Sequence, residues 1–535
     1  MRNGLLAVIA FSTLFLVSLV IVYGASYFAA SPLAIARSIV VNGKIPQRIY
    51  DVSGFWNDHA NTFINYPGSA LLISALSIVM DVDYYAFARL PLVAIPWVLV
   101  LFCVTKLFVK ENKCLCVLVT FALTVLTLSI YPHSWTINYH SLSYLSHLFT
   151  LFLSTKLILE GDRSRSRRIS MMLLLFYTIS LLNYYATSMF SIVLLLGLVS
   201  WATILRGVNY VGFTTRLPLL FFVAYITYDV MFWNVISYWK LDVAGLFETI
   251  TASVSRFLSG LPASEKLFRY GYPFELTLLD KWLKYIYLSF IGPYAILTLA
   301  LIYLAPILPG EKKKLAILVL SSLSVAAFES IPYAIVTGGI NVRYLSFFVP
   351  IMTMSITGML LSHQRLTNIK KVIFCVLLIY LMIVAVSSIK LNYINNAVSG
   401  LGVNKKELVQ WPEYTTLASY APPQTLIYSN FQISGELRLS SIKVGTDRYV
   451  LCSPFEEAIY DFFEAIEKRS LEKLRKSLGE RSIIVLAYSD FSKPMYGDVW
   501  GYAVRPLGEQ AKKWLENTAL DLAYDSGRLK TFYIK

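Results

Sequence analysis

The sequence predicts a mainly α-helical, polytopic membrane protein of about 11–13 transmembrane helices, with a small external α/β domain at its C-terminal end. The first observation is composition: of 535 residues, 56% are hydrophobic and only 15% are charged, and the mean hydropathy is +0.60. The second is a series of long apolar runs, and the third is the confinement of basic residues to alternate loops. Soluble proteins of this length carry more charge and no such runs.

Eleven apolar runs are candidates for crossing the bilayer, because a helix of about 20 residues pairs all its backbone groups while it spans the hydrocarbon. They are residues 4–23, 88–109, 115–131, 141–159, 169–184, 187–205, 217–237, 285–308, 315–336, 344–362 and 372–390. The first run is interpreted as an uncleaved anchor, with a secretory signal peptide as the alternative. A further run, 68–81, gives only about 21 Å of helix against a core of about 30 Å, so we interpret it as a short or re-entrant helix.

The basic residues predict the orientation. They gather in alternate loops: Lys106, Lys110, Lys113, Arg163, Arg165, Arg167, Arg168, Arg206, Arg216, Lys312, Lys313, Lys314, Arg365, Lys370 and Lys371. The short loops between these contain a single basic residue, Arg343. By the positive-inside rule the N-terminus is cytoplasmic, and the loops 24–66 and 238–284 and the C-terminal domain are extracytoplasmic. Orientation and anionic lipids account for the net charge of +15, so we expect no nucleic-acid partner.

The composition changes near residue 394, which divides the chain into a membrane domain, 1–393, and an external domain, 394–535. In the external domain the pattern predicts strands at 425–428 and 482–488, and an amphipathic helix over 456–478. A second helix over 510–516 and a hairpin of 522–525 with 529–534 complete it. Its single cysteine, Cys452, excludes a disulfide within the domain.

The first outward loop holds the residues best suited to chemistry, in the stretch IYDVSGFWNDHANTFINYPG. Asp51 is the first candidate for a general base and Asp58 the second, and together they offer ligands for a divalent metal such as Mg²⁺ or Mn²⁺. His59 can bind a phosphate or complete the metal site, with a surface or capping residue as the alternative, and Trp56 lies beside these acids. The alternative is that both acids are ordinary loop residues that cap turns.

Further candidates come from other outward positions. Arg343, with Tyr344 beside it, can hold a lipid phosphate through two parallel hydrogen bonds, although it can equally be an arginine that contacts head groups. His140, with His133, is assigned to an outward loop that contains Pro132 and Trp135, and it is a candidate for ligand contact. His133, His140 and His147 are spaced by seven residues, about 10 Å of helix, which is too far apart to bind one metal ion from a straight helix. Two acids within apolar runs, Asp229 and Glu329, are suspected of function because ionisable groups there are costly.

Several segments in a fixed order carry a resemblance. The first span is followed by YFAASPLAIARSIVVNGKIP, the acidic aromatic loop, YPGSALL and DVDYYAFARLP; Arg343 and Tyr344 open a late span, and the chain closes with YDSGRLKTFYIK. This order resembles GT-C-type membrane glycosyltransferases, especially archaeal members related to the dolichyl-phosphate-mannose and oligosaccharyl transferase group. Such proteins usually carry an acid directly after the first span, where this chain has Gly24, Ala25 and Ser26. Either Asp51 or Asp58 takes over that role, or catalysis has been lost.

The resemblance implies an enzyme that moves a sugar from a polyprenyl-phosphate carrier to an acceptor, a protein or a glycan, on the outer face of the cell membrane. Membrane lipids and the polyprenyl-phosphate sugar are the implied partners. A catalytically inactive scaffold of the same fold, which binds lipid or organises a cell-surface assembly, stays open as the alternative. A transporter is less favoured, because the sequence shows no pair of related halves.

Overall fold

The computed structural model describes residues 30–47, 63–108, 113–130, 137–205, 216–233, 305–337 and 412–534, and a few isolated residues between them. There are gaps inside these ranges, of which the longest are 441–450 and 453–464. Contacts divide the chain into two compact units. The first comprises residues 1–18, 90–263 and 282–389, and the second comprises 19–89, 264–281 and 390–535. The predicted boundary at 394, between a membrane part and an external part, is a statement about the bilayer and stays a prediction.

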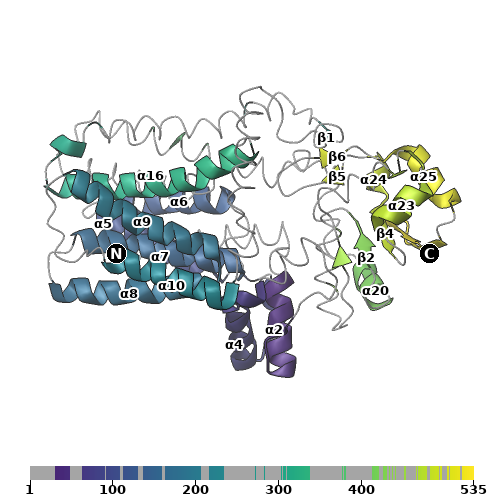
Figure 1. Ribbon diagram of the computed structural model, residues 1–535, viewed down its shortest axis with the longest axis horizontal. Coiled ribbons are helices and arrows are strands. Elements are labelled where there is room, and N and C mark those ends of the chain that lie inside the picture. The colour runs from purple at the N-terminus through teal and green to yellow at the C-terminus, as the bar shows by residue number, and fades with distance from the viewer. Residues whose placement is uncertain are drawn as a thin grey trace. The chain divides into compact units, whose positions relative to one another are not determined.

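The first unit is a bundle of long helices (Figure 1). Its helices are α5 (Ala94–Phe108), α6 (Lys113–Ile130), α7 (Tyr139–Leu159), α8 (Arg163–Leu181), α9 (Tyr185–Ile204), α10 (Arg216–Tyr228) and α16 (Gly310–Thr337), with short turns η5 (Asp229–Trp233, π) and η6 (Ala305–Ile307, 3-10). Each long helix falls on an apolar run of the sequence, so these runs are confirmed as helices. Few residues separate α7 from α8 and α8 from α9, and these three helices pack together, with α8 antiparallel to both α7 and α9; α16 packs on α9.

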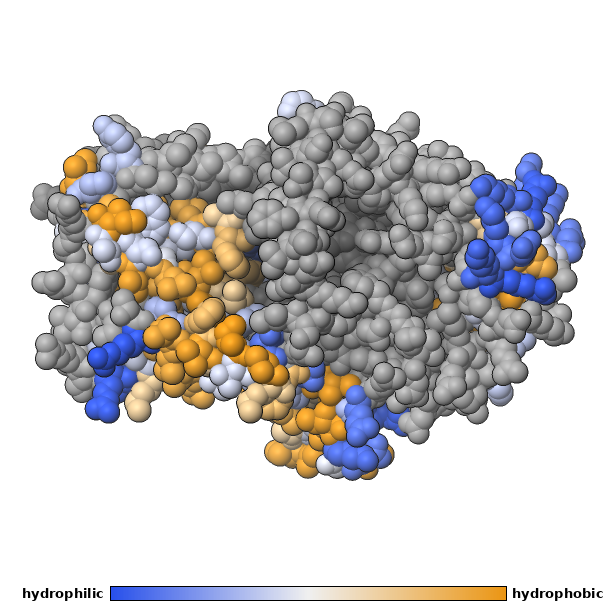
Figure 2. Space-filling view, in the orientation of Figure 1, coloured by the Kyte–Doolittle hydropathy of each residue, from blue (hydrophilic) through white to orange (hydrophobic). Residues whose placement is uncertain are grey.

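The bundle has an apolar outside and a partly polar inside. The large apolar side chains exposed on it include Met171 and Leu175 on α8, Leu196 on α9, and Leu219 and Val223 on α10; Figure 2 shows hydrophobic residues along its flank. The buried side chains include many serines and threonines and two histidines. Water favours the reverse arrangement, whereas helices in lipid associate through small and polar residues.

A helix that crosses a bilayer needs about 20 predominantly apolar residues. Among the described helices, only the segment Thr187–Ile204 of α9 is both long and apolar enough to cross a membrane, and shorter apolar segments are found in α2, α4, α5 and α16. The predicted number of membrane crossings therefore stays a prediction.

A glycine sets the closest approach between two of these helices. A Cβ atom added to Gly197 on α9 would lie 3.1 Å from the Cα atom of Ser321 on α16. A side chain at this position would require α16 to shift by a few tenths of an ångström. Small residues at such crossings increase the van der Waals contact between helices, which is the main attraction available to them in lipid.

The second unit contains a helical pair, α2 (Ala30–Asn42) and α4 (Gly68–Met80), with the 3-10 turns η2 (Phe63–Asn65) and η3 (Tyr84–Ala88). The predicted short helix over 68–81 is confirmed as α4. It ends at Asp81, whose backbone is left-handed (φ 53°). Asp83 then accepts a hydrogen bond from the Tyr85 amide at 3.0 Å, so both acids serve the turn between elements, as acids often do.

The second unit also contains a five-stranded sheet in the order β3-β2-β4-β8-β7. Strands β2 (Leu426–Tyr428), β3 (Leu451–Cys452) and β4 (Ile483–Ala487) are parallel, while β8 (Leu529–Tyr533) is antiparallel to both β4 and β7 (Asp521–Asp525). A small sheet joins β1 (Gly271–Tyr272), β6 (Ala503–Val504) and β5 (Met495–Tyr496). The helices are α20 (Pro412–Tyr420), α23 (Leu471–Leu478), α24 (Ser489–Ser492) and α25 (Gly508–Asn517). The strands predicted at 425–428 and 482–488, the helix at 510–516 and the closing hairpin are confirmed.

The five-stranded sheet is buried on both faces. Successive residues of a strand point to opposite faces, and in β4 Ile484 and Leu486 join one apolar cluster with Phe532, Leu474 and Leu515. The alternate residues of β4 join a second cluster, which includes Ile483, Val485, Ala487, Tyr414, Leu417 and Leu529. Helices α23 and α25 therefore cover one face and α20 covers the other, which is the α/β arrangement that the sequence predicts for this part of the chain.

The single helix predicted over 456–478 is wrong, because the chain turns at Arg469. Arg469 adopts a left-handed φ of 51°, its amide bonds to the Ile466 carbonyl at 3.1 Å, and the Ser470 amide bonds to the Ala465 carbonyl at 2.9 Å. This pair of bonds is a Schellman motif, which closes a helix. Ser470 then starts α23, since its hydroxyl accepts a bond from the Lys473 amide at 3.3 Å.

Candidate functional site

Of the predicted site residues, the structure describes His140. Those outside the described residues are Asp51, Trp56, Asp58, His59, Arg343 and Tyr344. Their roles, and the metal site that Asp51 and Asp58 would form, stay predictions. Among the residues that the structure describes, no three histidine, cysteine, aspartate or glutamate side chains are grouped to hold a metal ion.

The prediction that His140 lies in a loop is wrong, because α7 begins at Tyr139. Asn138 caps this helix: its side-chain oxygen accepts a bond from the Ser141 amide at 2.8 Å, and the Ser141 hydroxyl accepts one from the Asn138 amide at 3.0 Å. Two backbone donors at the helix end are thereby satisfied reciprocally, as in a capping box. The cap fixes His140 in the first turn of α7.

His140 lies among three tyrosines, and we call Tyr139, His140, Tyr144 and Tyr184 the His140 cluster. The ring centroid of His140 is 4.2 Å from that of Tyr139, 4.5 Å from that of Tyr184 and 6.2 Å from that of Tyr144. His140 itself is buried. Tyr184 directly precedes α9, so the cluster joins the beginnings of α7 and α9.

The His140 cluster lies at the end of the helices that lacks basic residues. Lys156 is in the last turn of α7 and Arg163, Arg165, Arg167 and Arg168 begin α8, at the opposite end from Tyr139 and Tyr184. The structure thus brings together two short loops that the charge pattern assigned to one side of the bilayer. Aromatic and imidazole groups at that end can contact a sugar or a lipid head group.

One to two turns further along α7, more polar side chains lie between α7, α8 and α9. We call Ser143, His147, Ser180, Thr187, Ser188 and Ser191 the polar seam. The Ser143 hydroxyl donates to Thr187 at 2.6 Å, His147 Nδ1 lies 2.9 Å from the Ser191 hydroxyl, and the Ser188 hydroxyl donates to Ser180 at 3.2 Å. All six side chains are buried. A sequence signal could have found the seam: His140, Ser143, His147, Thr150 and Ser154 recur every three or four residues on α7.

Asp229 also lies inside the bundle. It is 1% exposed and opens η5, a π-helical turn that follows α10. Single π-turns within helices often occur at functional sites. Glu329 is a half-buried residue of α16. The functional roles suspected for these two acids stay predictions.

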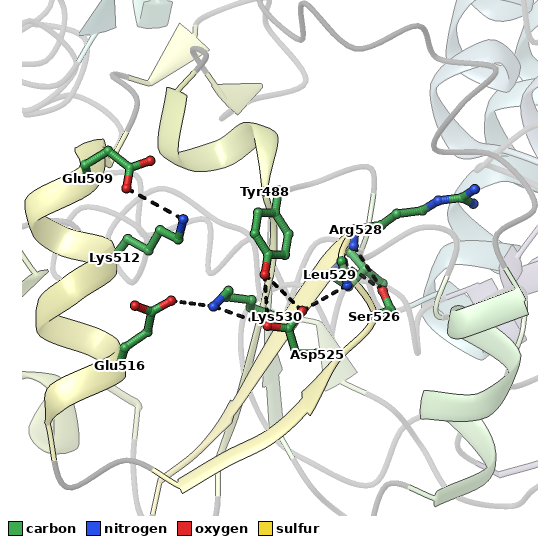
Figure 3. A network of polar contacts seen from close by, with 10 residues as sticks. Tyr488, Glu509, Lys512, Glu516, Asp525, Ser526, Arg528, Leu529 and Lys530 are labelled. Carbon is green, nitrogen blue, oxygen red and sulfur yellow. Dashed lines mark hydrogen bonds and ion pairs between the residues drawn. The ribbon is translucent and has the colours of Figure 1, made fainter.

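A second cluster of polar side chains, which the sequence analysis did not predict, lies at the five-stranded sheet of the second unit (Figure 3). We call this sheet with the helices that cover it the sheet domain. Lys530 on β8 is buried and forms ion pairs with Glu516 on α25 and, at 3.3 Å, with Asp525 on β7. Its ammonium also lies 5.2 Å from the ring centroid of Tyr488. The Tyr488 hydroxyl donates to both oxygens of Asp525, at 3.0 and 2.9 Å. We call these four residues the Lys530 network.

The Lys530 network fastens three elements of the domain. It joins α25, the closing hairpin and the turn after β4, because Lys530 pairs with Glu516 and Asp525 and the Tyr488 hydroxyl bonds to Asp525. The Gly527 amide bonds to Asp525 and holds the pKa of that carboxyl below its usual value, with Tyr488 and Lys530 adding to the effect. The bond to Glu516 raises the pKa of Lys530. The ammonium of Lys530 thus lies between two carboxylates and links β8 to α25 and β7.

The network predicts how the stability of the sheet domain depends on pH. The contribution of Asp525 is complete above about pH 4, the ordinary pKa of aspartate, and is lost as the pH falls through its lowered pKa. That of Lys530 is complete below about pH 10 and is lost as the pH rises through its raised pKa. Lys530→Met is expected to cost about 1–3 kcal/mol at neutral pH and to reduce the loss at alkaline pH. Pulse proteolysis of the full-length protein in urea measures both.

Two observations would contradict this account. One is a Lys530→Met variant as stable as the wild type at neutral pH, and the other is a wild type and a variant with the same alkaline profile. Lys476→Met, at an exposed lysine of α23, is the matched control, and we expect it to leave both quantities unchanged.

Comparisons with known proteins give loose likenesses of fold. The oligosaccharyltransferase AglB from Archaeoglobus fulgidus, solved in complex with an inhibitory peptide and a dolichol-phosphate, aligns with a TM-score of 0.48 and 13% identity over 91% of this chain and 69% of its own. ArnT from Cupriavidus metallidurans bound to undecaprenyl phosphate aligns with a TM-score of 0.42 and 10% identity over 100% of this chain and 98% of its own. ArnT in the apo state gives a TM-score of 0.39, at 10% identity over 99% and 98%. No protein-family model matches the chain, and no curated protein matches it.

Proposed function

We propose that this protein is a polytopic membrane glycosyltransferase that moves a sugar from a polyprenyl-phosphate carrier to an acceptor on the outer face of the membrane. The observation that carries the membrane part is the helical bundle, with apolar side chains outside and serines, threonines and histidines inside. The His140 cluster lies at the end of α7 and α9 away from the basic residues, and this end is the outer one under the positive-inside rule. The acidic loop that contains Asp51 and Asp58 is assigned to the same side.

The proposed chemistry needs a base and a cation. Asp51 removes the proton from the acceptor hydroxyl, whose oxygen attacks the anomeric carbon of the sugar, and the bond from that carbon to the phosphate oxygen breaks. The electron pair leaves with the polyprenyl phosphate, and the Arg343 guanidinium stabilises the charge on it. Asp58 is the second candidate for the base. His59, Trp56, Tyr344 and His140 are proposed to contact the carrier or the sugar.

A divalent metal is a further proposal for the same step. Mg²⁺ or Mn²⁺ held by Asp51 and Asp58 would offset charge on the departing phosphate. Residues 48–62, which contain these ligands, lie outside the described part of the chain. In the proposed reaction, Asp51 and Arg343 therefore carry the proton transfer and the stabilisation of the phosphate.

A second candidate function is a catalytically inactive protein of the same architecture that binds lipid or organises a cell-surface assembly. A specific observation favours it: Gly24, Ala25 and Ser26 stand where proteins with this sequence pattern usually carry an acid. A transporter is the third and least favoured candidate.

The test is an assay of the full-length protein reconstituted in vesicles with a labelled polyprenyl-phosphate sugar. We expect the label to move to an added acceptor extract and an equivalent amount of polyprenyl phosphate to be released. Carrier binding without transfer would overturn the enzyme proposal in favour of the scaffold. Uptake of the labelled sugar into the vesicle lumen, without a new glycosidic product, would overturn it in favour of a transporter.

A further inference from the structure

In the α2–α4 pair, small and polar residues of α4 are buried and large apolar residues are exposed. This is the reverse of what water favours. The face of α4 that packs inward consists of small or polar residues with one isoleucine: Ser69, Ala70, Ile73, Ser74 and Ser77. The Ser74 hydroxyl bonds to the carbonyl of Ala70 in its own helix at 2.7 Å and lies 3.3 Å from the carbonyl of Ala36 on α2. Small and hydroxyl-bearing residues let two helices approach closely, which is how helices associate in lipid.

The opposite face of α4 is apolar and exposed. Val79 is 83% exposed and Ile78 is 64% exposed, and the other large exposed residues of the helix are Leu71, Leu72 and Met80. Leu71 and Ile78 are seven residues apart, as are Leu72 and Val79, so these four lie on one side of α4, while Met80 is exposed at the end of the helix. The helix has no charged residue between Gly68 and Met80, and Figure 2 shows hydrophobic residues gathered over this pair. An apolar surface of this extent is unfavourable in water.

α4 has no charged residue and α2 has one, Arg37, which is half-buried, so the exposed charged residues of the pair lie beyond the helix ends. Lys44 is exposed just after α2, next to exposed Val41 and Ile45, and Asp81 and Asp83 are exposed just after α4. A lysine beside exposed apolar residues complements a surface that presents phosphate groups above an apolar layer. That combination describes a phospholipid bilayer better than it describes a protein partner, for which polar contacts across the apolar face would be expected as well.

The length of α4 then decides how it meets the bilayer. Its 13 residues give about 20 Å of helix, which is too short for a hydrocarbon core of about 30 Å. An apolar helix of this length is typical of an interfacial or re-entrant segment, which enters the bilayer without crossing it.

We infer that the α2–α4 pair is a lipid-docking element, whose exposed face of Leu71, Leu72, Ile78, Val79 and Met80 is covered by the bilayer. In the sequence the pair brackets residues 48–62, so docking would hold both ends of the acidic loop near the lipid surface. The inference rests on the membrane location in the proposed function, and it is independent of sugar transfer.

The experiment places a nitroxide label at a single cysteine, Val79→Cys, in the full-length protein with its five native cysteines replaced. The protein is reconstituted in vesicles of phosphatidylcholine and phosphatidylglycerol, and collisions with oxygen and with a water-soluble nickel chelate are compared. Oxygen concentrates in lipid and the chelate in water. We expect the label at Val79 to collide with oxygen several-fold more than with the chelate.

Two reference positions make the result decisive. Leu196→Cys labels the exposed apolar surface of α9, and Glu509→Cys labels a strongly exposed site of α25 in the sheet domain. A value at Val79 like that at Glu509 overturns the inference, as does shielding from both reagents, which would mean that protein covers the face. If the label at Leu196 also shows the ratio of oxygen to chelate collisions found at Glu509, the membrane location on which the proposed function rests is contradicted as well.

Discussion

Replacement of Asp51 by alanine is expected to lower sugar transfer by about 10²- to 10⁴-fold, the usual contribution of a positioned general base. The carrier should bind with little change, because the base acts on the acceptor hydroxyl and not on the carrier. Asp51→Asn should be as inactive as Asp51→Ala, since an amide has the shape of the carboxylate and cannot take the proton. Initial rates at saturating carrier, with carrier binding measured separately, give both quantities.

The matched control for this variant is Asp83→Ala. Asp83 is an acid of the same part of the chain, but the structure places it as a cap for the turn η3, where it bonds to the Tyr85 amide. Its loss should cost about 1 kcal/mol of local stability and leave transfer near the wild-type rate. If Asp51→Ala retains transfer and Asp58→Ala loses it, the roles of the two acids are exchanged; if both retain transfer, the proposed base is wrong.

The second large effect is expected in the sheet domain, where Phe532→Ala should cost about 3–5 kcal/mol of stability. Phe532 is fully buried, pairs with Ile484 across β8 and β4, and packs in the cluster that includes Leu474 and Leu515. Deletion of its ring removes contacts on three elements and leaves a cavity that the sheet cannot close. The urea midpoint in pulse proteolysis of the full-length protein, followed through a C-terminal tag, measures the loss.

Tyr420→Ala is the control for this prediction. Tyr420 is an aromatic residue of α20 in the same unit, and it is 81% exposed, so its removal opens no cavity and should change the midpoint little. Equal midpoints for Phe532→Ala and the wild type would show that the cluster around Phe532 does not hold the domain together.

Local patterns predicted most of the described elements. The apolar runs 88–109, 141–159 and 187–205 became α5, α7 and α9, because the spacing of apolar residues is a property of neighbours in the chain. The closing hairpin was predictable for the same reason, since Ser526 and Gly527 favour a turn between two strands and Gly527 takes a positive φ of 76°.

The break in the predicted helix over 456–478 could not be predicted in the same way. A left-handed residue that ends a helix is usually glycine or asparagine, and here it is Arg469. Its side chain also donates a hydrogen bond to Gln510 on α25 at 2.6 Å, a residue far along the chain. A tertiary contact thus accompanies a backbone conformation that local propensity disfavours.

Long apolar helices, a charge difference between their two ends, and a mixed α/β segment near the C-terminus could all be predicted from the order of residues. The packing of distant elements was needed to show that the beginnings of α7 and α9 share one aromatic cluster, that Ser143 bonds to Thr187, and that Lys530 lies between Glu516 and Asp525. Apolar periodicity and charge are read within a few turns of chain, whereas the partner of a buried polar group is chosen by the packing of distant elements.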